Sequence, residues 1–275
     1  MQKVIYTNQI QDYTDKINQN IIDYLNADQI ELVESFPNYN IIAFQVYDID
    51  NIFKRPEKIM IYLDKEDLFY ICNTSEAYNI INNYYQASET NEHALYLFFE
   101  NLLKGNNKHL EIIEDRISKV DASIINENNK NARSKIMGLQ YEILRLKKYY
   151  EQFDFIFDEL CINDNELLTK STLKYFRILK NRSYRLLTTI MNLKEYIIQV
   201  RESYQAQMDI EQNKLMKFFT IITSIFSPLT LLVGWYGMNL KIPEFTWDYG
   251  YLFVIVLSIV ICVSWYLIFK KKKWF

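Results

Sequence analysis

A stripe of small and hydroxyl-bearing residues follows one face of a predicted helix near the end of the chain. Its members recur at alternating spacings of three and four residues, which brings them to one side of an α-helix: Asn213, Met216, Thr220, Thr223, Ser227, Thr230, Gly234 and Gly237. Asn239 follows directly, and its amide oxygen can bind a cation or the water shell around one.

Two explanations fit this stripe if the helix lies in lipid. Small residues let helix backbones approach closely, so the stripe can be a packing face, and for the stripe alone this is the more common role. Polar residues within a membrane also line water-filled paths. The extension of the stripe to Asn213 at one end and Asn239 at the other favours a path.

Two apolar segments surround this region and predict a pair of membrane spans. Residues 218–236 and residues 251–269 each comprise 19 residues without a charge. At about 1.5 Å rise per residue, each forms a helix roughly 28 Å long, which matches the hydrocarbon core of a bilayer. Trp and Tyr at the ends are typical of the membrane interface. Two buried core helices are the alternative.

Basic residues predict the orientation of the spans. Lys214 and Lys217 precede the first span, whereas the loop between the spans has only Lys241. Four lysines follow the second span: Lys270, Lys271, Lys272 and Lys273. The positive-inside rule therefore predicts a multi-pass protein of the cell (inner) membrane with both termini in the cytoplasm. The outer loop carries Glu244 and Asp248, which would attract cations.

The composition argues against several other functions. A formal charge of −3 and the absence of a basic face in the body of the chain argue against nucleic acid as a partner. The three cysteines have no spacing typical of a metal site or a disulfide framework, and the first residues do not resemble a signal peptide. No phosphate-binding glycine loop, nucleophile elbow or zinc motif is present, so we expect neither an enzyme nor a cofactor.

The region before the spans is predicted to contain long helices, because residues 139–227 include neither glycine nor proline. One apolar seam predicts a helix that ends at a turn near residues 161–165: Ile136, Leu139, Ile143, Leu146, Tyr150, Phe153, Phe157 and Leu160. A second seam predicts its antiparallel partner: Leu186, Ile190, Leu193, Ile197, Val200 and Tyr204. Nothing stops this partner before the membrane, so residues 169–236 are predicted to form one helix.

The first 90 residues are predicted to form a small sheet flanked by helices. Strands are expected at 31–36, 41–48, 58–64 and 67–73, and helices at 9–26 and 75–86. Residues 88–127 are predicted to be helical, with an interruption at residues 105–107. The expected fold class is α+β, in three parts: a cytoplasmic α/β domain at 1–90, a cytoplasmic helical stalk at 91–216 and a transmembrane hairpin at 217–275.

A single chain with two spans cannot enclose a path. Several copies must therefore surround an axis, with the first span inside and the second span facing the lipid bilayer.

Residues 236–239, Tyr-Gly-Met-Asn, resemble the signature of the CorA family of divalent-cation channels, which carry Gly-Met-Asn at the end of the first of two C-terminal spans. Further matches are Pro243-Glu244, the Ser-Pro-Leu-Thr of residues 227–230 and the terminal Lys-Lys-Lys-Lys-Trp-Phe. The likeness is close over residues 213–275, looser from about residue 135 and only architectural before that. It implies a funnel-shaped homopentamer that passes Mg²⁺, and in many members Co²⁺ or Ni²⁺, down the electrochemical gradient.

The resemblance also implies roles for single residues. Gly237, Met238 and Asn239 would form the selectivity filter, in which a ring of Asn239 holds a hydrated ion. Five residues match pore-facing positions of the family: Asn213, Thr223, Ser227, Thr230 and Gly234. Since Ser227 stands where a bulky apolar gate residue is common, the gate is expected at Met216 and Phe219.

Regulation and the basic tail follow the same resemblance. Glu202 matches a stalk position at which intracellular Mg²⁺ would bind against a neighbouring subunit, although Ile178 stands where some relatives have an acid. Candidate partners of Glu202 are Asp64, Glu66 and Asp67. The four terminal lysines would either anchor the span to anionic lipid or form a basic ring at the inner pore mouth.

Three functions are thus weighed. The leading hypothesis is a pentameric Mg²⁺ channel, with Mg²⁺ as substrate and regulator. The second is a channel of the same architecture that prefers Zn²⁺, Co²⁺ or Ni²⁺, although Met238 in place of Ile leans toward Mg²⁺. The third is a membrane-anchored helical scaffold without flux.

Overall fold

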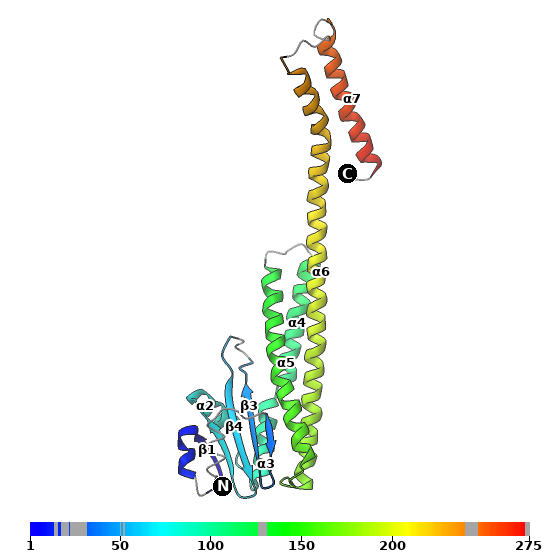
Figure 1. Ribbon diagram of the computed structural model, residues 1–275. Coiled ribbons are helices and arrows are strands. Elements are labelled where there is room, and N and C mark those ends of the chain that lie inside the picture. Colours follow the sequence, from blue (N-terminus) through cyan, green and yellow to red (C-terminus); the bar gives the residue numbers. More distant parts are fainter. Residues whose placement is uncertain are drawn as a thin grey trace. The chain divides into compact units, whose positions relative to one another are not determined.

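A computed structural model describes residues 1–13, 16–17, 22, 32–49, 51, 53–125, 131–239 and 247–272 (Figure 1). The chain divides into two compact units, Met1–Glu202 and Ser203–Phe275. The helix α6, Lys170–Tyr236, contributes to both of them. The division into three parts at residues 90 and 216 stays a prediction.

The first unit contains a five-stranded sheet with the strand order β1-β5-β4-β3-β2. Its strands are β1 (Gln2–Tyr6), β2 (Val33–Ser35), β3 (Tyr39–Val46), β4 (Glu57–Asp64) and β5 (Leu68–Cys72). β1 pairs in parallel with β5, and the other neighbours are antiparallel. The four predicted strands are confirmed, but the sequence patterns do not predict β1. This edge strand has five residues and buries only Ile5, so its alternation is too short to be recognised.

Both faces of the sheet are covered, which explains why β3, β4 and β5 are almost continuously apolar. One face packs with the 3₁₀-helix η1 (Thr7–Tyr13), and its buried cluster includes Ile10, Ile41, Met60 and Phe69. On the other face, the ring of Phe44 lies 5.6 Å from Phe99 and 5.7 Å from Phe153 between centroids. These two rings belong to α3 (Asn91–Leu103) and α5 (Ala132–Ile162).

The helix predicted at residues 9–26 falls mostly outside the described residues. Its described beginning is the 3₁₀-helix η1 rather than an α-helix. The helix predicted at 75–86 is confirmed as α2 (Ser75–Tyr84), which begins after a side-chain cap from Thr74.

Lys104 and Gly105 lie between α3 and α4 (Asn106–Ile125). The interruption predicted at residues 105–107 is therefore confirmed. Gly105 has a φ of +83°, a left-handed conformation that other residues rarely adopt. The chain therefore changes direction here without strain.

The predicted pair of long helices is confirmed. α5 ends at Asn163, whose left-handed φ of 52° forms the expected turn. All eight seam residues of α5 are buried, as are those of α6 except Tyr204, which is half-buried. The two helices are antiparallel, because Phe157 packs on Phe176, whereas the earlier Asp154 accepts a hydrogen bond of 3.5 Å from the hydroxyl of the later Ser183.

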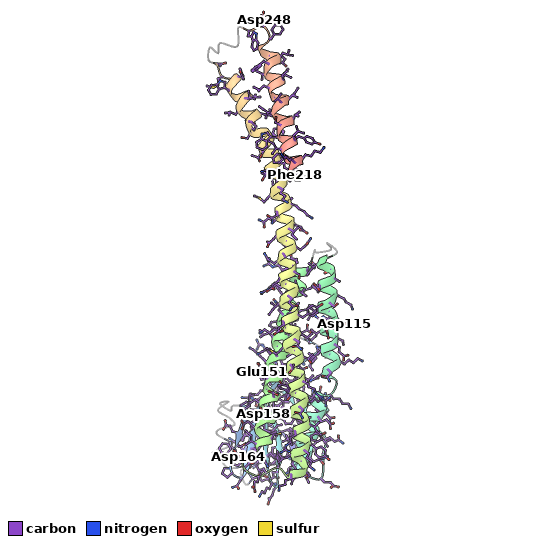
Figure 2. All side chains as sticks on the ribbon, turned by 90° about the vertical axis from the view of Figure 1, so that its right-hand side faces the viewer. Asp115, Glu151, Asp158, Asp164, Phe218 and Asp248 are labelled. Carbon is purple, nitrogen blue, oxygen red and sulfur yellow. The ribbon has the colours of Figure 1, made fainter. Side chains whose placement is uncertain are left out.

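The second unit contains the C-terminal part of α6 and the helix α7 (Gly250–Lys271), which lie side by side in Figures 1 and 2. Both helices have an apolar stretch long enough to cross a membrane. The residues of these stretches are almost all exposed, so they are not core helices of a soluble domain. This exposure supports the predicted pair of spans.

Candidate functional site

The predicted stripe lies on an exposed face of α6. Eleven predicted site residues of this helix end are all exposed: Asn213, Met216, Phe219, Thr220, Thr223, Ser227, Thr230, Gly234, Gly237, Met238 and Asn239. The half-buried positions of this stretch are Ile221, Ser224, Ile225, Pro228, Leu229, Leu232 and Tyr236, and all of them except Ser224 lie on the side of α6 away from the stripe. α7 is the neighbouring helix in this unit (Figure 1). The described residues thus leave the stripe on an uncovered side of α6.

The threonine hydroxyls of the stripe are already satisfied as donors. Thr220, Thr223 and Thr230 each donate a hydrogen bond of 2.8 Å to the backbone carbonyl four residues earlier. Their oxygen lone pairs stay available as acceptors. These three threonines therefore offer oxygen acceptors to the stripe, which suits water molecules around a cation.

The two glycines of the stripe differ in the space that surrounds them. A Cβ atom on Gly237 would lie 2.9 Å from the carbonyl oxygen of Val233, to which the Gly237 N–H donates at 2.9 Å. A side chain is thus excluded by the turn that ends α6. Gly234, by contrast, has no atom within 4 Å of an added Cβ. Nothing in the described chain requires glycine at 234.

Met238 and Asn239, the predicted filter residues, follow this turn and are exposed. Asp248 is also exposed and lies just before α7, as labelled in Figure 2. Glu244 and Lys241 lie outside the described residues. The exposed acid and amide oxygens that are described thus belong to the same end of the second unit, at the turn after α6 and at the start of α7.

The opposite end of the second unit carries the predicted gate and the basic tail. Met216 and Phe219 are 58% and 60% exposed, on the same face as the threonines. Lys270 and Lys271 form the last turn of α7, and Lys272 follows directly. Lys273 lies outside the described residues. The positive charges therefore gather at the C-terminal end of α7, where they complement the helix dipole.

A comparison with known protein families identifies the family of this chain. The profile described as "CorA-like Mg2+ transporter protein" matches residues 8–271, almost the whole chain. The chain is a member of the CorA-like Mg²⁺ transporter family. The resemblance based on Gly237, Met238 and Asn239 is confirmed, and so is the α+β fold class.

Individual relatives agree with this assignment. The cobalt/magnesium transport protein CorA of Thermotoga maritima is 27% identical over 267 residues, which cover 92% of this chain and 75% of that protein. The magnesium transport protein CorA of Haemophilus ducreyi is 44% identical over 68 residues, 24% of this chain and 22% of its own length. The solved CorA magnesium transporter of Methanocaldococcus jannaschii shares the fold, with a TM-score of 0.77 at 18% identity over 100% of this chain and 91% of that chain.

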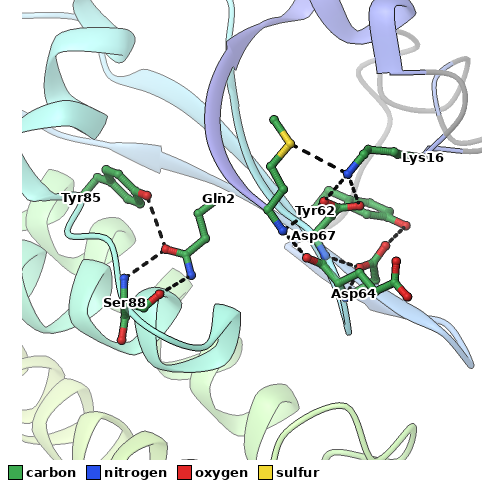
Figure 3. A network of polar contacts seen from close by, with 9 residues as sticks. Gln2, Lys16, Tyr62, Asp64, Asp67, Tyr85 and Ser88 are labelled. Atoms are coloured by element: carbon green, nitrogen blue, oxygen red, sulfur yellow. Dashed lines mark hydrogen bonds and ion pairs between the residues drawn. The ribbon is translucent and has the colours of Figure 1, made fainter.

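In this CorA-like chain, two of the three acids considered as partners of Glu202 are occupied within the first unit (Figure 3). The buried Asp67 carboxylate lies 2.8 Å from Lys16 Nζ and 3.1 Å from the N-terminal ammonium. Burial alone would raise the pKa of Asp67, but these two cations outweigh it and hold that pKa below its usual value. Asp64 accepts hydrogen bonds from the N–H groups of Glu66 and Asp67.

Glu202 and Glu66 are exposed. Glu66 is therefore the more available partner for a cation at Glu202, and the regulatory site stays a prediction. Among the described residues, no three His, Cys, Asp or Glu side chains cluster as a bare metal ion would require.

Sequence reasoning missed one buried charged cluster. Glu142 is buried in α5, where its carboxylate lies 2.8 Å from Arg116 Nη1 and 3.8 Å from His109 Nε2. Burial alone would raise the pKa of Glu142, but His109 and Arg116 lower it below its usual value. The available signal was its spacing, because Glu142 stands three residues after Leu139 and four before Leu146 on the buried seam.

Proposed function

We propose that copies of this chain assemble around the α6 stripe and pass Mg²⁺, and with it Co²⁺ or Ni²⁺, through the cell membrane down the electrochemical gradient. The observation that carries the proposal is that the stripe is exposed and lies largely opposite the half-buried side of α6. An exposed polar face on a membrane helix needs other copies or water beside it. Membership of the CorA-like family supports five copies around one axis.

Asn239 is proposed to select the ion. Mg²⁺ exchanges its water reluctantly and prefers oxygen ligands in octahedral geometry. A ring of amide oxygens can hold the intact water shell and so avoids the energy of dehydration. Gly237 keeps the backbone close to the end of α6, which positions Asn239 at the outer entrance, with Glu244 and Asp248 attracting cations there.

The cytoplasmic side is proposed to control conduction. Met216 and Phe219 would form the apolar gate where the stripe leaves the membrane, and Lys270, Lys271, Lys272 and Lys273 would surround the inner mouth. Mg²⁺ bound at Glu202 against a neighbouring subunit would favour the closed state. Because Ile178 stands where some relatives have an acid, this feedback by Mg²⁺ should be weaker in this chain.

Flux measurements on purified protein in liposomes test the proposal. Wild-type protein should admit Mg²⁺, followed with an enclosed Mg²⁺-sensitive dye, and Asn239→Ala should nearly abolish this flux because the amide ring is lost. Asn192→Ala is the matched control, since Asn192 is an exposed asparagine in the part of α6 that belongs to the first unit. Its flux should equal that of the wild type.

Competition among ions separates the alternatives. If Zn²⁺ enters faster than Mg²⁺ and suppresses Mg²⁺ entry, the chain is a channel of the same architecture with another substrate. The proposed path is wrong if the wild-type protein gives no flux of any divalent cation, or if Asn239→Ala leaves the flux unchanged. Either result would favour the hypothesis of a membrane-anchored helical scaffold.

A further inference from the structure

A second site is suggested by a cavity in the first unit, separate from the α6 stripe. It has a volume of about 270 Å³ and joins residues 47 and 53–56, which belong to the connection between β3 and β4, with one face of α5. Small-molecule sites in proteins begin at about 300 Å³, so the cavity suits a ligand of one or two rings.

Aromatic side chains supply much of the lining. Phe53 and Tyr141 line the cavity and are 83% and 52% exposed, although phenylalanine is among the residues that are most often buried. Their rings are nearly parallel, with 16° between the planes and 6.5 Å between the centroids. Leu144, also in the lining, adds exposed apolar surface. The cavity thus presents aromatic faces on which a flat ring can stack.

The charged side chains of the lining all carry the same sign. Four cations line the cavity: Lys54, Arg55, Arg145 and Lys148. None of the described residues that line it is acidic. Lys54 Nζ lies 3.2 Å from the Glu76 carboxylate, so part of its charge is neutralised. The remaining positive charge favours an anionic ligand.

The other three cations differ in their surroundings. The guanidinium carbon of Arg145 lies 5.0 Å from the centroid of the Tyr47 ring, which also lines the cavity. Arg145 is only 9% exposed, so water screens its charge poorly. Arg55 and Lys148 are exposed and can turn toward a ligand. Arg55 also has a planar fork of donors that suits carboxylate and phosphate oxygens.

We propose that this cavity binds a small anion that carries a flat aromatic ring, the chemistry of a nucleoside monophosphate or of an aromatic carboxylate. The ring stacks on Phe53 and Tyr141, and the anionic group accepts hydrogen bonds from Arg55 and Lys148. This class of ligand uses the rings and the cations of the lining at once. The site lies within the first unit and does not depend on the proposed path along α6.

Calorimetric titration of the full-length protein tests this proposal, in nanodiscs of zwitterionic lipid because anionic lipid would compete for the cations. AMP and 2-naphthoate serve as probes, in Mg²⁺-free buffer with EDTA so that binding of Mg²⁺ by AMP does not contribute heat. Each probe has a neutral counterpart, adenosine or 2-naphthylmethanol, and sodium phosphate supplies charge without a ring. Wild-type protein should bind at least one probe saturably, and its neutral counterpart and phosphate at least about tenfold more weakly.

Two variants test the rings and the cations separately. Phe53→Ser and Lys148→Gln should each weaken binding of the probe about tenfold, because one loses a stacking face and the other an ionic hydrogen bond. Their matched controls are Phe155→Ser and Lys135→Gln, which change exposed residues of α5 outside the cavity lining. Each control should change affinity less than about threefold.

The relative affinities decide the outcome. Tighter binding of AMP than of 2-naphthoate identifies a nucleotide as the class of ligand, and the reverse identifies an aromatic carboxylate. The proposal is overturned if neither probe binds saturably, or if phosphate or the neutral counterpart binds as tightly as the probe. It is also overturned if the two control variants weaken binding as much as Phe53→Ser and Lys148→Gln.

Discussion

Replacing Gly237 with alanine should disturb the filter through one short contact. The new Cβ would lie 2.9 Å from the Val233 carbonyl oxygen, whereas ordinary contacts of this kind begin at about 3.4 Å. Residue 237 must therefore move by about 0.5 Å, away from the oxygen that accepts its own N–H. Weakening that hydrogen bond costs about 1 kcal/mol, and the displaced backbone adds a similar amount.

A total of about 1–2 kcal/mol lowers the population of the wild-type turn about 5- to 30-fold. Because Asn239 follows this turn by two residues, we expect Mg²⁺ flux into liposomes to fall by the same factor. The protein should still assemble, since the change lies at the exposed end of α6. Wild-type flux in Gly237→Ala would refute the reasoning that this contact positions Asn239.

Gly234→Ala adds the same methyl group one turn earlier and is the matched variant. Apart from the backbone of its own helix, no described atom lies within 4 Å of the new Cβ, and alanine favours a helix interior by about 1 kcal/mol. If the stripe lines a water-filled path, the variant should assemble and conduct. If the stripe is a packing face, the methyl group should collide with a neighbouring helix, and size-exclusion chromatography should show loss of the oligomer.

Two further predictions concern the first unit. Asp67→Asn should lower the melting temperature at neutral pH, because Lys16 and the N-terminus lose their partner. The pKa of Asp67 is lower in the folded state, so its contribution to the free energy of unfolding is complete above the unfolded pKa of about 3.9 and is lost as the pH falls through the folded pKa. The melting temperatures of the variant and the wild type should therefore converge in acid. Equal melting temperatures at pH 7 would contradict this. Glu142→Gln should destabilise the protein by about 1–2 kcal/mol, because Arg116 and His109 lose the buried carboxylate that they contact. A thermal-shift measurement that shows no change would refute this prediction.

The long helices were predictable because their apolar positions repeat over many turns. Eight seam residues mark α5 from Ile136 to Leu160, and the interruption at Gly105 and the turn at Asn163 have local causes in backbone conformation. Short elements lack this redundancy. β1 offers one buried residue in five, so only its parallel pairing with β5 reveals it.

The candidate site shows a different limit. The spacing of Thr220, Thr223 and Thr230 predicts a common face, but a periodic pattern does not say what that face contacts. The structure adds that the face lies largely opposite the half-buried side of α6. It also shows that no described residue leaves too little space for a larger side chain at position 234.

The most direct test of the central claim is the reactivity of two single cysteines in α6, one on the stripe and one beside it. Thr230→Cys lies on the stripe, whereas Val233→Cys replaces a residue that is 67% exposed but lies off the stripe. Both are placed in a chain in which Cys262 is replaced by alanine, and a charged, water-soluble thiol reagent is added during Mg²⁺ flux. The account predicts that the reagent blocks flux through Thr230→Cys and leaves Val233→Cys unaffected. Equal reactivity of the two positions, or an unreactive Thr230→Cys in a conducting protein, would contradict a water-filled path along the stripe.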